Sequence, residues 1–162
     1  AMRSVIKNRQ IVEDHWQAVG EEDELPVGAV IVPLTRWRRE RVELLGRNEP
    51  LGVRLPNTAD VAELVADLPL LDLVALEFPK FSDGRAYSQA RLLRERHGYR
   101  GEIRAVGDVL RDQLFFMVRS GFDAFELRAD RSLEDALGAF DEFSTSYKPA
   151  AVNPLPLFQG GG

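Results

Sequence analysis

The chain has 162 residues, of which 44% are hydrophobic and 29% charged, a composition typical of one globular domain and not of a disordered or fibrous chain. Its 26 acidic and 21 basic side chains give a net charge of -5, so nucleic acid is not an expected partner. The absence of cysteine excludes disulfides, thiol catalysis and thiolate-held iron–sulfur or zinc sites, and with only two histidines we expect no metal and no cofactor.

Residues 1–24 are expected to form a β-hairpin and an acidic linker. The apolar pairs 5–6 and 11–12 flank a polar turn, which is the pattern of a short hairpin. Four consecutive acidic side chains at 21–24 follow and are expected to stay solvated. Because the sequence has neither a signal-peptide core nor an apolar run of about 18 residues, we expect a cytoplasmic protein with no membrane partner.

Residues 25–146 alternate apolar runs with helix-period segments, which predicts an α/β domain of about five βα units. The runs are nearly continuous, as in strands covered on both faces. The predicted strands are 28–33, 51–56, 72–79, 101–107 and 122–127. We expect a parallel sheet flanked by helices in an open, doubly wound arrangement; the alternative is a partial (βα) barrel.

Residues 147–162 are rich in proline and glycine, which excludes a regular helix and predicts an extended tail. Its apolar side chains, Leu155, Leu157 and Phe158, are expected to dock on the same domain, a second copy or another protein.

Ligands of parallel α/β sheets collect at the carboxyl ends of the strands. The loop PKFSDGR (79–85) places an amine, a hydroxyl, a carboxylate and a guanidinium close together after one predicted strand. After the next strand, the spacing of Asp108 and Asp112 predicts two carboxylates on one helical face. An anionic small molecule would suit these groups, although helix capping and solvation suit them as well. The candidate ligand-binding residues are Lys80, Ser82, Asp83, Arg85, Arg104, Asp108, Asp112 and Gln113, and none is assigned a catalytic role.

Two charge patterns accompany these residues. Four predicted strands each carry one charge near the exit end, with alternating sign: Arg54, Glu77, Arg104 and Glu126. In a sheet that follows chain order, each would lie beside an opposite charge, as structural ion pairs or as the floor of a polar pocket. The segment 80–104 carries seven basic and three acidic side chains, which suits either an acidic partner or a solvated helical face.

Residues 78–127, from FPKFSDGR to FDAFEL, resemble the central signature of the bacterial domain-of-unknown-function family 934. The segments VIVPLTRW (30–37) and LGVRLP (51–56) resemble other parts of that family's pattern. Members are typically encoded beside the sulfite reductase hemoprotein and are sometimes labelled oxidoreductases. The resemblance therefore implies a role in sulfite reduction, but it supplies no catalytic residues.

A chain without cysteine and without a GxGxxG fingerprint is poorly suited to carry electrons itself. We therefore expect an accessory protein of assimilatory sulfite reduction that assists or docks to the sulfite reductase hemoprotein. The contact would be the Arg-rich 80–104 segment, the acidic face or the tail. The alternatives are a small cofactor-free α/β enzyme or binding domain for an anionic metabolite, and a purely structural role for the charges. A homo-oligomer is compatible with each of them.

Overall fold

The computed structural model describes residues 3–80, 83–128 and 132–146, the last six of these by their backbone only. The predicted tail, 147–162, lies outside the described residues. Within the described ranges, no helix is both long enough and apolar enough to cross a bilayer.

The described strands form one eight-stranded sheet in the order β2-β1-β8-β7-β6-β5-β4-β3. Neighbours from β3 to β8 are parallel, and β1 is antiparallel to both β2 and β8. The strands are β1 (Arg3–Lys7), β2 (Gln10–Asp14), β3 (Gln17–Ala18), β4 (Val30–Pro33), β5 (Leu51–Leu55), β6 (Leu73–Phe78), β7 (Glu102–Gly107) and β8 (Ala124–Phe125).

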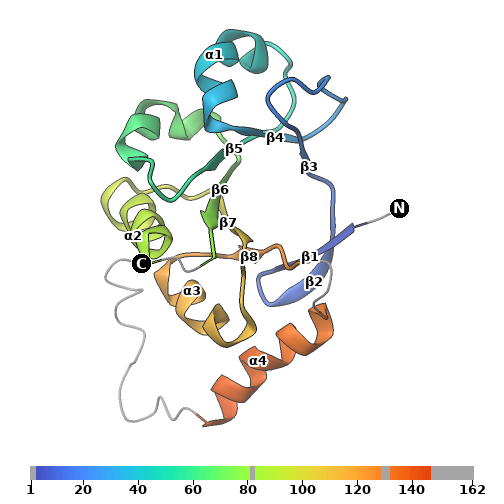
Figure 1. Ribbon diagram of the computed structural model, residues 1–162, viewed down its shortest axis with the longest axis vertical. Coiled ribbons are helices and arrows are strands. Elements are labelled where there is room, and N and C mark those ends of the chain that lie inside the picture. Colours follow the sequence, from blue (N-terminus) through green and yellow to red (C-terminus); the bar gives the residue numbers. More distant parts are fainter. Residues whose placement is uncertain (1–2, 81–82, 129–131, 147–162) are drawn as a thin grey trace.

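The sheet curls into a half-barrel with the helices around its outside (Figure 1). The helical elements are α1 (Leu34–Leu45), the 3₁₀ helix η1 (Val61–Leu70), α2 (Arg85–Arg91), its π-helical continuation η2 (Leu92–Arg96), the 3₁₀ turn η3 (Arg111–Gln113), α3 (Leu114–Ser120) and α4 (Leu133–Ser146). The edge strands β2 and β3 are joined by only two residues, His15 and Trp16, which connect one edge of the curled sheet to the other.

The α/β class and the N-terminal hairpin are confirmed, and the hairpin pairs Val5 with Val12 and Ile6 with Ile11. The expected open, doubly wound parallel sheet is wrong. A doubly wound sheet reverses its strand order near the middle, whereas β3 to β8 follow one another across this sheet in chain order, as in the alternative, a partial barrel. The sheet is mixed because β1 adds antiparallel to β8.

The two faces of the sheet bury different side chains. The main core lies between the convex face and the helices, and its strand residues include Val53, Val74 and Ile103. A small second cluster lies on the concave face, where Trp16 packs against Ile31, Leu73, Ala75 and Val106. Alternate residues of each strand therefore contribute to opposite sides of the sheet.

The ends of β6 and β7 lie very close to each other. The loop that leads from β7 to η3 begins at this close approach. Gly107 has φ +94°, and a Cβ there would lie 2.6 Å from the carbonyl oxygen of Phe78. The backbone N–H of Asp108 donates to the same carbonyl at 2.7 Å. A glycine is thus required at the point where the chain leaves β7 towards η3 and α3.

Candidate functional site

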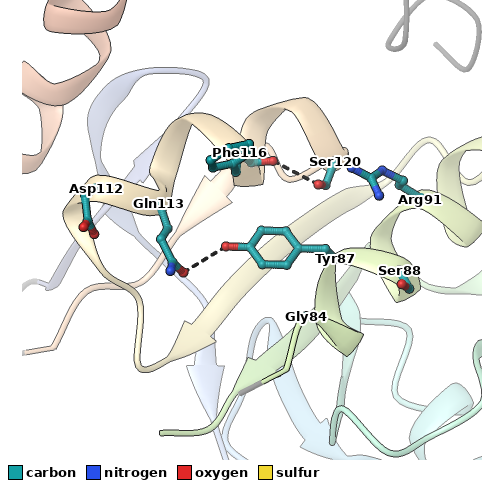
Figure 2. A pocket seen from close by; sticks show the side chains of 8 residues that line it. All are labelled: Gly84, Tyr87, Ser88, Arg91, Asp112, Gln113, Phe116 and Ser120. Atoms are coloured by element: carbon teal, nitrogen blue, oxygen red, sulfur yellow. Dashed lines mark hydrogen bonds between the residues drawn. The ribbon is translucent and has the colours of Figure 1, made fainter. Parts of the chain in front are cut away.

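A pocket of about 560 Å³ lies between α2 and α3 (Figure 2). One wall belongs to α2 and the residue before it, and the other to η3 and α3. The lining residues are Gly84, Tyr87, Ser88, Arg91, Asp112, Gln113, Phe116 and Ser120. We call this pocket the α2–α3 groove.

Helical spacing places these side chains on the two facing surfaces. Asp112, Phe116 and Ser120 are four residues apart, and Tyr87 and Ser88 lie one turn before Arg91. Residues three or four apart project from the same helical face. Each wall of the groove is therefore one helical stripe of mixed polar and aromatic side chains.

Opposite charges lie at the two ends of the groove. Figure 2 shows Asp112 at one end and Arg91 at the other, with the ring of Tyr87 between them. Both charged side chains are exposed, and neither forms an ion pair with another residue of the described part of the chain. As far as the described part of the chain extends, the groove thus presents an unpaired carboxylate and an unpaired guanidinium to solvent.

Tyr87 ties the two walls together. Its hydroxyl donates to the Oε1 atom of Gln113 at 2.9 Å, and its ring packs edge-on against Phe78 of β6, with centroids 5.2 Å apart. Burial, together with the negative charge of Asp112, raises the pKa of the Tyr87 hydroxyl above its usual range. The Tyr87 hydroxyl therefore keeps its proton, and its hydrogen bond to Gln113, to a higher pH than an exposed tyrosine would.

The structure brings two of the predicted ligand-binding residues, Asp112 and Gln113, together in the groove. Asp108 does not share a helical face with Asp112, because η3 begins only at Arg111 and Asp108 lies in the preceding loop. The expected carboxylate pair on one helix is therefore wrong. Asp108 instead pairs with Arg128 at 3.1 Å.

The PKFSDGR loop supplies less free charge than its composition suggests. Asp83 and Arg85 pair with each other at 3.0 Å, and both side chains are more than half exposed. Lys80 is exposed at the other end of the loop, and Ser82 lies outside the described residues. Of the described residues of this loop, Gly84 alone lines the groove.

Arg104 lies elsewhere, on the concave face of the half-barrel. Its register partner Ala75 belongs to the small concave cluster, and the Arg104 side chain is only 2% exposed. The guanidinium contacts Asp14 at 3.0 Å, Glu102 at 2.9 Å and Glu126 at 3.4 Å. We call these four residues, with Lys7 and Arg3 at the rim, the interior cluster.

The interior cluster is balanced in charge. Lys7 pairs with Glu102 at 3.0 Å, and Arg3 contacts both Asp14 and Glu126. Burial by itself lowers the pKa of Arg104, but the hydrogen bond with Asp14 and the negative charge of Glu102 outweigh burial and raise it. The guanidinium is thus held charged by its neighbours.

Opposite charges do meet within the row of strand charges, as the sequence predicts. Arg54 contacts Glu77 at 2.6 Å and Arg104 contacts Glu126 at 3.4 Å. Sequence reasoning missed two other partners of Arg104: Glu102, two residues earlier on the same strand, and Asp14, which comes from the distant N-terminal hairpin. It also missed Tyr87, Phe116 and Ser120 in the groove, whose helical spacing was the available signal.

Within residues 3–80, 83–128 and 132–146, no three histidine, cysteine, aspartate or glutamate side chains come together as ligands for a metal ion. The model of a family described as a bacterial protein of unknown function, DUF934, matches residues 52–158 of the chain. No curated protein and no solved structure matches it. The matched range contains both walls of the groove and Arg104, but not the N-terminal hairpin.

Proposed function

Because the chain belongs to the bacterial family DUF934, we propose that it is an accessory protein of assimilatory sulfite reduction that docks to the sulfite reductase hemoprotein. The family resemblance points to the process, and the surface of α2 and η2 offers a contact. The observation that supports docking is a set of exposed arginines that have no carboxylate partner among the described residues: Arg91, Arg96 and Arg100.

These arginines differ from those of α1. Each arginine of α1 pairs with a carboxylate. The pairs are Arg36 with Glu40, Arg38 with Glu63, Arg39 with Glu21, and Arg41 with Asp67. The α1 arginines are thus neutralised within the chain. On η2 and the turn after it, the positive charge stays available in a protein whose net charge is -5. A local field of opposite sign to the whole protein favours one orientation of an acidic partner.

Apolar side chains are exposed beside these charges. Leu92, next to Arg91 on the same helix, is 38% exposed, and Phe116 of the groove is 58% exposed. Arginine and aromatic side chains are enriched at protein interfaces, where each buries a large area and keeps a polar or charged end. The combination suits a protein partner better than a solvated helical face.

The competing proposal, an anionic metabolite at the strand ends, has less support. Of its candidate residues, four already have opposite partners within the described residues: Asp83, Arg85, Arg104 and Asp108. The others are Lys80, Asp112 and Gln113. At the four paired residues, a ligand would have to displace ion pairs that already exist within the chain. We therefore favour docking.

Two measurements test docking: binding of the chain to the hemoprotein and the rate of sulfite reduction. The full chain is expected to copurify with the cognate hemoprotein, to bind it more weakly as salt increases, and to change the rate of sulfite reduction. Arg96→Ala with Arg100→Ala removes two positive charges and should weaken binding about tenfold, since each exposed contact contributes about 0.2–1 kcal/mol.

The matched control is Val27→Glu with Val42→Glu, which changes the net charge by the same amount at positions that are 85% and 80% exposed. It should leave binding unchanged. Absence of association together with an unchanged rate would overturn the proposal. Equal weakening by both double variants would overturn the assignment of the contact to η2.

A further inference from the structure

We propose that the α2–α3 groove recognises a short extended segment of a partner protein, with an acidic group at the Arg91 end, a basic group at the Asp112 end and an apolar side chain between them. This inference rests on the proposed docking function only in taking the partner to be a protein. It adds the chemistry that the partner segment must carry.

The charges at the two ends give the groove a polarity. Arg91 and Asp112 line the same pocket from opposite walls, and Figure 2 places them at opposite ends of it. Since neither has a partner among the described residues, neither charge has to be released before a ligand binds. A ligand of one sign would be repelled at one end, so a segment that carries both signs fits best.

The middle of the groove offers apolar contact and fixed hydrogen bonds. The rings of Tyr87 and Phe116 come from opposite walls, and the second of them is 58% exposed. Tyr87 is already held by Gln113, whose amide nitrogen has no hydrogen bond to another described residue. An apolar side chain would pack on the rings while this amide donates to a backbone carbonyl of the segment.

The depth of the groove favours a peptide over a small molecule. Sites for small ligands bury about 70–90% of the ligand surface. Here Ser88, Arg91, Asp112 and Phe116 are all exposed, so the lining is open to solvent along the two helices. An extended chain suits this shape because its outer face can stay hydrated while alternate side chains enter.

The length of the groove sets the length of the segment. The α2 wall extends from Gly84 to Arg91, which at 1.5 Å per residue spans about 10 Å. An extended chain covers that span in about three residues. The two charged groups of the segment should therefore be three or four positions apart, with the apolar side chain between them.

The test uses capped pentapeptides and the isotope-labelled full chain, followed by NMR of the backbone amides. The first peptide has lysine first, leucine third, glutamate fifth and alanine elsewhere; the second exchanges the lysine and the glutamate. At about 10 mM, one of them should saturate a site with a Kd of about 1 mM and shift amides of residues 84–91 and 112–120. The one that binds more tightly fixes the direction of the segment.

Charge reversal gives the specificity control. Arg91→Glu should weaken binding of the preferred peptide about fivefold and should instead favour a peptide with lysine at both ends. Arg96→Glu is the matched control, because Arg96 is exposed on the continuation of the same helix but does not line the groove. It should leave peptide binding unchanged.

Three results would overturn the groove assignment: no shifts with either peptide, shifts outside the two walls, or equal binding of a pentapeptide with glutamine at both ends. Because these measurements contain no hemoprotein, they fail independently of the docking function. Peptide binding without hemoprotein association would overturn only the identity of the partner. Hemoprotein association without peptide binding would overturn only the groove.

Discussion

The interior cluster and the α2–α3 groove contain the same kinds of charged group, but only in the cluster do these groups form ion pairs among the described residues. In the cluster, Arg104 is 2% exposed and each of its carboxylate neighbours is paired. In the groove, Arg91 and Asp112 are exposed and have no ionic partner among the described residues. An unpaired charge is costly when it is buried, whereas at the surface water stabilises it. An exposed charge can therefore remain unpaired until a ligand binds.

The contrast separates a structural from a functional use of charge. The carboxylates of the cluster come from β2, β7 and the residue after β8, so Arg104 joins the N-terminal hairpin to the parallel part of the sheet. The groove lies on the opposite, convex side of the sheet, between two helices. A variant at each place should therefore change a different measurable quantity.

The largest expected effect is on the free energy of unfolding. Arg104→Ala leaves Asp14, whose side chain is fully buried, and Glu102, which is 6% exposed, without the guanidinium. Breaking a buried ion pair by removing one partner costs about 3–5 kcal/mol. For a chain of this length the melting temperature should fall by roughly 6–20 °C, as measured by calorimetry.

The control for that variant is Arg85→Ala. Arg85 is 58% exposed, and its one ionic partner among the described residues is the similarly exposed Asp83, so its loss should change stability by about 0.5 kcal/mol or less. Urea unfolding of both variants checks the difference. If Arg104→Ala were no less stable than Arg85→Ala, the cluster would not hold the hairpin to the sheet.

The buried residue Tyr99 should make the free energy of unfolding depend on pH. Tyr99 is 6% exposed and its hydroxyl donates to the carbonyl of Leu71 at 2.9 Å. Burial raises its pKa above the usual range, and nearby carboxylates, including Glu102 of the interior cluster, add to the rise. The folded state therefore favours protonated Tyr99 more strongly than the unfolded state does.

The sign of the pH effect follows from that difference. The stabilisation is fully present below the unfolded tyrosine pKa of about 10 and is lost as pH rises above it. Tyr99→Phe should cost about 1 kcal/mol at neutral pH through the lost hydrogen bond, but its stability should fall less between pH 8 and 11. Parallel slopes in urea unfolding at these pH values would contradict the assignment.

Local pattern was enough to predict the hairpin and the strands β4 to β8, but not the short strand β3 or the way the sheet curls. The hairpin was predicted because Val5, Ile6 and Ile11 lie around a polar turn within a few residues. The order of β3 to β8 depends on how successive βα units pack, and the two edge strands β2 and β3 are connected through His15 and Trp16. Such contacts between segments far apart in sequence leave no periodic signal in either segment.

The same limit explains which site residues were found. Asp112 and Gln113 were predicted because they follow a strand, and Arg104 because it is a charged residue within a largely apolar strand. The buried partner Asp14 is 90 residues away from Arg104, so no spacing could indicate it. The sequence shows that Phe116 and Ser120 lie on one face of a helix. It does not show which other helix that face would contact.

The smallest effect should be on the titration of Tyr87, which measures the electrostatics of the groove. Both burial and the charge of Asp112 raise the Tyr87 pKa, with burial the larger cause. Asp112→Asn removes the charge at nearly constant size, so the pKa should move down towards the usual value without reaching it. Ring-labelled tyrosine followed by NMR across alkaline pH resolves this residue from the other two.

Glu95→Gln is the matched control, because Glu95 is exposed on η2 but does not line the groove. Added salt separates the two causes, since it screens the Asp112 charge but not burial. In high salt the wild type should approach the Asp112→Asn variant, while both keep a raised pKa. If Asp112→Asn left the pKa of Tyr87 unchanged at low salt, Asp112 would lie too far from Tyr87 to define one end of the same groove. A segment with opposite charges at its two ends would then have no reason to prefer the groove.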